Sequence, residues 1–250
     1  MQEITAQEEE YAFPYHYVAQ FQDGRFRQHF VDTWGINYAL TIEYILSRVR
    51  ALQPAAIIDI GCGDGRLTRE LSLGTAVGSV TGVDFSARAI RLAQAMNADR
   101  PEIAFLATDI TQPHALGSFD LGVLMEVFEH IPPADCEAFL AGVRRLLKPG
   151  GTLLLTVPHA NKPLEYKHFQ HFTIDGLRRY LEPGFQIREV MPFEKRALSR
   201  DLLDGLLCNR LFVLNEPRLL AAIYRFHRRR LFACRDEGEC QRLYVEARVR

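Results

Sequence analysis

The sequence predicts one doubly wound α/β domain built on a mostly parallel sheet. From residue 55 to residue 193, short apolar runs alternate with segments whose apolar residues have helical spacing. Three of these runs end in an aspartate, and the first aspartate opens a glycine-rich turn. Apolar strands that alternate with amphipathic helices are typical of a parallel sheet covered by helices on both faces. We therefore expect a seven-stranded sheet of this kind.

The apolar runs place the strands along the chain. Five strands are expected to be parallel, and two further strands complete the sheet: 55–60, 79–85, 102–110, 119–127 and 151–158, then 185–193 and 242–249. The last segment, RLYVEARV, alternates apolar and polar residues. Such alternation predicts a strand, and we expect this one to lie antiparallel to its neighbour.

Helices are expected between these strands. Helical spacing predicts them at 36–52, 65–73, 87–97, 136–147 and 174–181. Ser86 and Asp135 are suited to cap the third and fourth, and Lys-Pro-Gly-Gly at 148–151 is suited to end the fourth. Residues 1–52 are predicted to be an N-terminal helical extension or lid. Residues 197–232 are predicted to be a helical insertion before the last strand of a domain that spans 53–250.

Composition indicates an ordinary folded domain. Hydrophobic residues make up 48% and charged residues 24%, and the net charge of -1 gives no electrostatic argument for nucleic acid or an anionic membrane as partner. The five cysteines are irregularly spaced without a CxxC pair, which speaks against a disulfide framework or a zinc knuckle. The polar start MQEITAQEEE is not typical of a secretory signal, and no apolar run approaches the ~18 residues of a membrane helix. We expect a cytoplasmic protein with no membrane partner.

The segment DIGCGDG, from Asp59 to Gly65, carries the strongest indication of a ligand site. It follows an apolar strand and precedes a helix, and its three glycines allow a tight turn and close approach of a ligand. The helix that follows presents its N-terminus to an anionic group. In open α/β sheets this edge is where ligands bind.

Two further aspartates narrow the kind of ligand. Asp84 ends the second strand, about 20 residues after the loop, where related folds place a carboxylate against ribose hydroxyls. Asp109 ends the third strand and is suited to accept a hydrogen bond from an adenine amino group. A nicotinamide-dependent dehydrogenase is the alternative, but position 66 is arginine where the GxGxxG spacing needs glycine.

Together, DIGCGDG, GVDFS, ATDI and LLKPGGTLLLTVP resemble the class I S-adenosylmethionine-dependent methyltransferases over about residues 55–193. The resemblance implies a Rossmann-like fold, residues 53–250 as the methyltransferase domain, and S-adenosylmethionine as the cofactor. It also implies the residues that surround each part of the cofactor. These are Asp59, Gly61, Cys62, Gly63 and Gly65 around the methionine part, Asp84 at the ribose, Phe85, Asp109 and Ile110 at the adenine, and Met125 at the methyl group.

An ExxEH motif, Glu126 to His130, follows the fourth strand, and a second segment with His168 and His171 follows the fifth. Because both strands end at the same edge of the sheet, these carboxylates and imidazoles are expected to converge. Such groups suit a divalent ion, Mg²⁺ or Mn²⁺. The motif resembles that of small-RNA 3′-terminal 2′-O-methyltransferases and of the O-methyltransferases of ubiquinone synthesis, where it holds a metal.

That second resemblance implies Glu126, Glu129, His130 and His171 as metal ligands, with His168 as the substitute for His171. Glu126, His130 and His171 are also the candidate catalytic residues, because a neutral imidazole can take a proton near pH 7. The alternative is that the motif shapes the acceptor pocket without any metal.

The resulting hypothesis is O-methylation of a small-molecule hydroxyl, of the sugar or natural-product type. RNA 3′-terminal 2′-O-methylation with a divalent metal is the alternative, and a fold that binds without catalysis is a third. The oligomeric state is left open. Two further segments are candidates for the acceptor site: an arginine run at 225–230, and the aromatic N-terminal stretch with Tyr15, His16 and Trp34.

Overall fold

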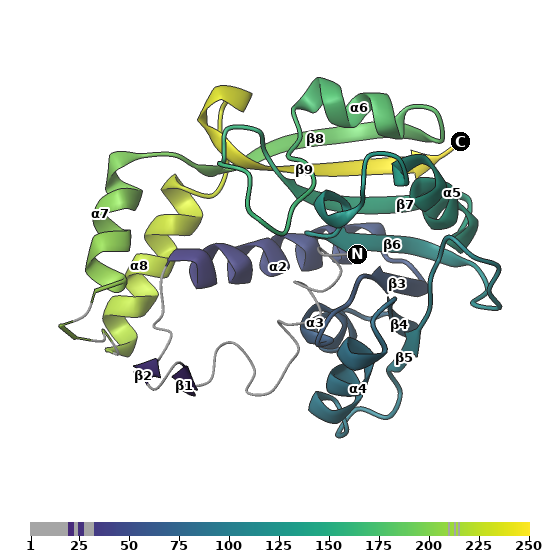
Figure 1. Cartoon of the computed structure of the whole chain (residues 1–250), viewed down its shortest axis with the longest axis horizontal. Coiled ribbons are helices and arrows are strands. Elements are labelled where there is room, and N and C mark those ends of the chain that lie inside the picture. Colours follow the sequence, from purple (N-terminus) through teal and green to yellow (C-terminus); the bar gives the residue numbers. More distant parts are fainter. Residues whose placement is uncertain (1–19, 23–24, 28–32, 210, 213, 215) are drawn as a thin grey trace.

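The computed structural model describes residues 20–22, 25–27, 33–209, 211–212, 214 and 216–250, and their side chains from residue 35 onward. Tyr15, His16 and the side chain of Trp34 lie outside this part, as does half of the predicted extension 1–52. Within it, a two-stranded antiparallel ribbon, β1 (Gln20–Gln22) and β2 (Arg25–Arg27), precedes the main domain (Figure 1). None of the described helices is long and apolar enough to cross a bilayer.

One seven-stranded sheet forms the centre of the domain, in the order β5-β4-β3-β6-β7-β9-β8. The strands, in that order, are Ala104–Ala107, Ser79–Asp84, Ala56–Ile60, Phe119–Met125, Leu147–Pro158, Cys240–Val249 and Phe185–Lys195. The first five pair in parallel, whereas β9 is antiparallel to both β7 and β8. This confirms the predicted seven-stranded, mostly parallel sheet and its antiparallel last strand.

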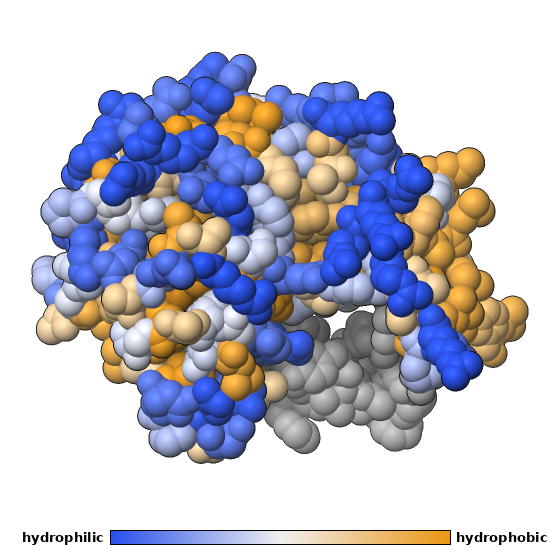
Figure 2. All heavy atoms as spheres, turned by 180° about the vertical axis from the view of Figure 1, so that it is seen from behind, coloured by the Kyte–Doolittle hydropathy of each residue, from blue (hydrophilic) through white to orange (hydrophobic). Residues whose placement is uncertain are grey.

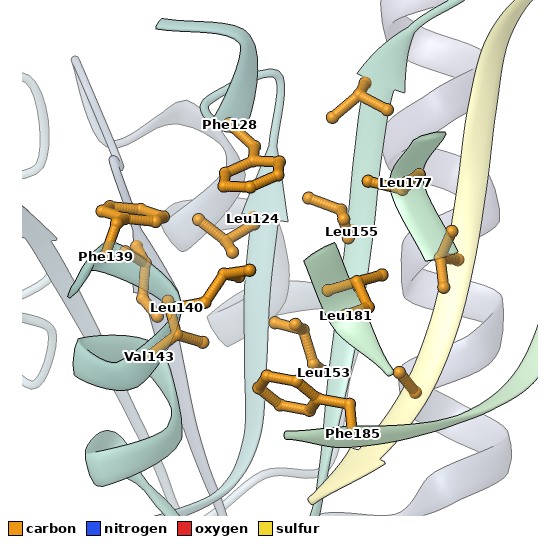
Figure 3. Packing of buried hydrophobic residues seen from close by; sticks show 14 of the residues in the cluster. Leu124, Phe128, Phe139, Leu140, Val143, Leu153, Leu155, Leu177, Leu181 and Phe185 are labelled. Carbon is orange, nitrogen blue, oxygen red and sulfur yellow. The ribbon is translucent and has the colours of Figure 1, made fainter. Parts of the chain in front are cut away.

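Helices cover both faces of the sheet. The helices are α2 (Thr33–Leu52), α3 (Arg66–Gly74), α4 (Ala87–Met96), α5 (Cys136–Leu146), α6 (Ile174–Leu181), α7 (Leu198–Leu207) and α8 (Pro217–Arg230). Buried side chains of α5 and α6 pack on one face around Leu124, Leu153 and Leu155 (Figure 3). Those of α2, α3, α7 and α8 share a second cluster that contains Leu121 and Leu154.

Alternation of side chains explains why the strands are apolar throughout. Leu153 and Leu155 lie in the cluster under α5 and α6, while Leu154 between them lies in the opposite cluster. Successive residues of a strand point to opposite faces, so a sheet covered on both sides needs apolar residues at every position.

Three local expectations need correction. The third strand ends at Ala107, so Asp109 and Ile110 lie in the loop after it. The fifth strand begins at Leu147 and includes Lys-Pro-Gly-Gly, because these residues already extend the sheet edge beyond the helix. Asp135 precedes α5 with a helical backbone and no side-chain cap bond, whereas Ser86 caps α4 by accepting from the Ala89 amide.

The packing of α5 on the loop after β5 depends on a glycine. A Cβ on Gly142 would lie 2.5 Å from the carbonyl oxygen of Ile110, whereas nothing lies within 4 Å of a Cβ on Gly205 in α7. We expect Gly142→Ala to lower the free energy of unfolding by about 1–3 kcal/mol through overpacking. Gly205→Ala, the matched control, is expected to raise it by up to ~1 kcal/mol. Urea denaturation measures both, and a Gly142→Ala protein as stable as the control would contradict this packing.

Candidate functional site

The glycine loop after β3 is closely fitted to its neighbours. Gly61, Gly63 and Gly65 have φ values of 72°, 55° and 77°, in the left-handed region that favours glycine. The amides of Gly61 and Cys62 both donate to the Val83 carbonyl, at 2.8 and 3.0 Å. A Cβ on Gly61 would lie 2.6 Å from a side-chain carbon of Val127. The loop therefore touches the ends of both neighbouring strands, β4 and β6.

Asp59 lies beneath this loop and joins it to α3. Its side chain is buried, and its Oδ2 accepts a hydrogen bond from the Thr68 hydroxyl at 2.6 Å. Burial, and then the charges of Asp84 and Asp64, raise the pKa of Asp59 to about 7, against the hydrogen bond from Thr68. The carboxyl group thus holds the helix N-terminus against the strand that carries the loop.

Cys62 offers the site its backbone rather than its thiol. The side chain packs in a small cluster with Ile90, Ala93, Ile103 and Phe105. Burial raises the pKa of the Cys62 thiol, which keeps it protonated and unreactive.

Asp84 is placed to order both the loop and the turn that follows β4. Its Oδ2 accepts from the Gly63 amide at 3.0 Å, and its Oδ1 accepts from the Ser86 amide at 2.9 Å. Beside it, the ring of Phe85 is 51% exposed, a large apolar surface for a flat ligand group. The carboxylate and the ring are the pair that the sequence assigned to ribose and adenine.

Asp109 and Ile110 follow the neighbouring strand. The exposed Asp109 accepts from the amide and hydroxyl of Thr111 through Oδ1, at 2.9 and 2.7 Å. The side chain of Ile110 is buried in the cluster under α5. Any contact of Ile110 with the cofactor would therefore involve its backbone.

Glu126 follows the last residue of β6, the partly buried Met125, and has a φ of 57°, an unusual value for a residue with a side chain. Its Oε2 accepts a 2.7 Å bond from Nε of Arg242 on β9. Although burial opposes ionisation, the charge of Arg242 holds the pKa of Glu126 below its usual value. Glu126 is thus an ionised carboxylate engaged by an arginine.

Arg242 belongs to a larger buried network of ion pairs, in which positive and negative side chains alternate. Its guanidinium also pairs with Glu194 at the end of β8, which in turn accepts from Arg200 of α7 at 2.5 Å. Glu194 has a φ of 61°, like Glu126. These four side chains are at most a quarter exposed. This network of ion pairs connects the helical insertion to the end of β6.

Glu129 and His130 lie in a short 3-10 helix, Phe128–His130, and His168 approaches them from the segment after β7. One ligand atom from each of these three residues lies within 4.8 Å of the others. Glu129 is fully buried, and neither of its carboxylate oxygens has a hydrogen-bond partner among the described residues. Burial, and then the charge of Glu126, raise the pKa of Glu129 well above its usual value.

Backbone carbonyls orient His130 and His171, and His171 in turn orients His168. His130 Nδ1 lies 3.0 Å from the Lys167 oxygen, and His171 Nδ1 lies 3.0 Å from the Lys162 oxygen. Since a carbonyl only accepts, each Nδ1 carries a proton. His171 Nε2 then accepts from His168 Nδ1 at 2.8 Å. This pattern leaves the lone pairs of His130 and His168 on Nε2.

Burial, and then the charge of His130, lower the pKa of His168 to about 4, and burial lowers the pKa of His171 as well. Both imidazoles are therefore neutral near pH 7. Of the four predicted metal ligands, the structure brings Glu129 and His130 together. The third member of the group is His168, the expected substitute, while His171 stands behind it as a hydrogen-bond acceptor.

Several site residues carry no sequence signal of their own. Arg242 is one polar position in an alternating strand, and Glu194 and Arg200 are charges of the kind usually found on surfaces. Tyr38 of α2 also belongs to the surroundings of the glycine loop. Burial, and then the charges of the loop residues Asp64 and Asp59, raise the pKa of its hydroxyl. Only the fold brings these residues to the site.

Comparison with known proteins agrees with this geometry. Residues 57–151 match the family described as "Methyltransferase domain" (Methyltransf_25). Over these residues, which are less than half of the chain, it is similar to a methyltransferase domain of the class I, S-adenosylmethionine-dependent kind. The matched segment begins in β3 and ends in β7, so it includes the glycine loop, Asp84 and the ExxEH motif.

Relatives and solved structures extend the comparison. The ubiquinone biosynthesis O-methyltransferase of Ralstonia nicotianae is 34% identical over 111 residues, which cover 42% of this chain and 44% of the relative. That of Rhizobium rhizogenes is 32% identical over 160 residues, 62% of each chain. The chain thus spans less than two thirds of these relatives.

The N-methyltransferase NodS of Bradyrhizobium japonicum, solved with S-adenosylhomocysteine, has the same fold. It superposes with a TM-score of 0.62 at 17% identity, over 100% of this chain and 99% of NodS. At this identity the likeness concerns the fold alone.

The role of Asp84 can be tested by cofactor affinity. We expect Asp84→Asn to weaken S-adenosylhomocysteine binding by about 10- to 100-fold, because the negative charge is lost and the one remaining oxygen can accept from only one of the Gly63 and Ser86 amides. Isothermal titration calorimetry measures the change. Asp99→Asn, which alters an exposed ion pair with Arg69, is the matched control. Equal affinities of the two variants would argue against this placement.

The raised pKa of Asp59 predicts a dependence of stability on pH. The unfolded chain ionises at this position near pH 3.8, but the folded chain does so near pH 7. The folded state therefore loses stability at this group as the pH rises from about 4 to about 7. We expect Asp59→Asn to gain stability relative to the wild type over that range, with no further gain above it. Urea denaturation at about pH 5 and about pH 8 measures this, and a constant difference would be the contrary result.

Proposed function

We propose that this protein transfers the methyl group of S-adenosylmethionine to a hydroxyl oxygen of a small-molecule acceptor. The observation that carries the proposal is the cluster of Glu129, His130 and His168 beside the glycine loop. Val127, which a Cβ on Gly61 would touch, lies in the same short segment as Glu129 and His130. A buried carboxylate and two oriented imidazoles therefore adjoin the place where the loop would hold the methionine part.

The glycine loop fits the cofactor in shape and chemistry. Side-chain-free backbone at Gly61, Gly63 and Gly65 would admit the methionine part, while Asp84 and Phe85 would bind the ribose and adenine. When bound, S-adenosylmethionine supplies an electrophilic methyl group on a sulfonium. The work of the chain is then to hold the acceptor oxygen in line with that methyl group and to exclude water.

The imidazoles would take the proton of the acceptor. His130 Nε2 carries a lone pair in the tautomer that the Lys167 carbonyl selects, so it can accept from a hydroxyl. His168, whose pKa is lowered to about 4, is a weaker base and a better positioning group. His171 would fix the tautomer of His168, in place of the catalytic role that the sequence suggested for it.

A divalent ion also fits this cluster. Glu129 has two buried oxygens without a described partner, and His130 and His168 each direct a lone pair from Nε2. One carboxylate and two imidazoles favour Mn²⁺ over Mg²⁺. Such an ion would lower the pKa of a bound hydroxyl. Glu126 would remain with Arg242 and would shape the site rather than ligate the metal.

The acceptor class rests on two supporting observations. The curated relatives are O-methyltransferases of ubiquinone biosynthesis by name. The total charge of -1 gives no general attraction for RNA, and the arginine run lies on α8, an element that contributes nothing to the Glu129 cluster. We therefore favour a small molecule, such as a sugar or a phenolic natural product, over an RNA end.

The proposal predicts a specific defect in Glu129→Gln. We expect methyl transfer from labelled S-adenosylmethionine to a panel of sugars and phenols to fall by at least ~100-fold, because an amide can neither take up a proton nor ligate a divalent ion as a carboxylate can. Affinity for S-adenosylhomocysteine is expected to stay within about 3-fold of wild type, because Glu129 belongs to no cofactor contact. Glu137→Gln, an exposed glutamate on α5, is the matched control.

Manganese titration by electron paramagnetic resonance separates the two forms of the proposal. Binding that is lost in Glu129→Gln and strengthens with pH would support the metal form, because the proton on Glu129 must leave when the ion binds. No binding, with activity lost in His130→Gln, would support imidazole alone as the base. Full activity in both Glu129→Gln and His130→Gln would overturn the role of the cluster.

A further inference from the structure

The two helices of the insertion leave a large apolar surface on the outside of the molecule. On α7, Leu198, Leu202 and Leu206 are 75%, 68% and 42% exposed and follow each other at intervals of four residues. Such spacing places them along one side of the helix. On α8, Leu219 and Phe226 are 45% and 40% exposed. Five large apolar side chains on one helix pair are more than the scattered exposure usual on a soluble domain.

A stripe of arginines accompanies these apolar residues. Arg218, Arg225 and Arg229 recur at intervals of seven and four residues, which places them on one side of α8, opposite the buried Ile223 and His227. All three are exposed, and none forms an ion pair with a described residue. Arg228 differs, since it pairs with Glu43 of α2 at 2.9 Å. No carboxylate of the described residues therefore neutralises this stripe.

Both helices are anchored on the domain, so the orientation of their exposed sides relative to the domain is fixed. Leu207 of α7 and Ile223 of α8 are buried in the cluster that includes α2. Arg200 anchors α7 through Glu194, and burial, and then the charge of Arg200, lower the pKa of His227 of α8. Figure 1 shows the two helices side by side at the edge of the domain.

Leu219, Ile223, Phe226 and Leu231 recur at the spacing of a helix that packs on a domain through one side. Only Ile223 and Leu231 are buried, because the inner side of α8 is taken by Ile223 and His227. Seen from behind, an apolar patch lies at the same edge of the molecule, bordered by hydrophilic side chains (Figure 2). We call the outward leucines, Phe226 and the arginine stripe together the α7–α8 surface.

Charge is distributed unevenly along the chain. Residues 197–232 contain seven arginines and three acidic residues, a net charge of +4, in a chain whose total is -1. The total charge and the short apolar runs, which led to the expectation of no membrane partner, do not describe this local excess of positive charge. A local patch with apolar side chains beside arginines has the composition of a surface that lies in the interface of an anionic membrane.

We propose that the α7–α8 surface docks on an anionic phospholipid bilayer. The leucines and Phe226 enter the boundary between headgroups and acyl chains, and the arginine stripe binds the lipid phosphates. A second copy of the chain is a poorer occupant. A two-fold contact would place this patch against itself, and the arginine stripes would repel each other. This inference goes beyond the proposed methyl transfer and stands without it.

Vesicle flotation tests the proposal. The wild-type chain is mixed with vesicles of phosphatidylcholine alone, or with about a third phosphatidylglycerol. We expect binding to the anionic vesicles that is at least ~10-fold tighter than to the neutral ones and weakens as sodium chloride is added. Two variants, Leu202→Asp and the double variant Arg225→Glu/Arg229→Glu, are each expected to lose at least ~10-fold in affinity.

Matched controls lie on other faces. Leu73→Asp alters a leucine that is 51% exposed on α3, and Arg91→Glu alters an exposed arginine on α4; both should bind vesicles as the wild type does. Thermal unfolding checks that each variant folds. Wild-type protein that binds neither vesicle, or binding that survives both surface variants, would overturn the proposal. A dimer in light scattering that Leu202→Asp dissociates, without vesicle binding, would assign the surface to a second copy.

Discussion

The site depends on how closely the backbone at Gly61 approaches Val127. This contact leaves no room for a Cβ, and it brings the end of β3 against the end of β6. On the other side of the loop, the carbonyl of Val83 accepts two loop amides and Asp84 accepts a third. The carboxyl ends of three parallel strands, β3, β4 and β6, thus meet at one compact turn. Every group with a proposed role in cofactor binding or methyl transfer lies on this edge or on segments that follow it.

A second constraint comes from buried charge. Arg242 is held between Glu126 and Glu194, and both glutamates have left-handed backbone conformations. Such conformations cost about 1–3 kcal/mol each and persist where surrounding contacts demand them. Because Arg242 neutralises Glu126, the nearby Glu129 is left as the carboxylate without a partner. The arrangement gives different surroundings to two glutamates only three residues apart: the charge of Arg242 holds the pKa of Glu126 below its usual value, whereas burial raises the pKa of Glu129.

The fold was predictable from sequence because its signals are local and repeated. The apolar runs, the helix cap at Ser86 and the glycines of the loop each predict the structure of the segment in which they occur. Asp84 was also predictable, since its position at the end of a strand defines where its carboxylate goes. The exchange of His171 for His168 was not, because it depends on carbonyl groups of Lys162 and Lys167 that select the tautomers. Likewise, Arg242 pairs with Glu126 across 116 residues, and no local pattern shows such a partner.

A crystal structure with S-adenosylhomocysteine bound tests the central claim most directly. The account predicts the homocysteine part on the loop from Gly61 to Gly65, the ribose at Asp84, and the sulfur directed toward the segment that carries Glu129 and His130. A ligand bound in this way would place the missing methyl group beside the one unpaired buried carboxylate of the described site. A ligand bound elsewhere, or with its sulfur turned away from Glu129 and His130, would contradict the account.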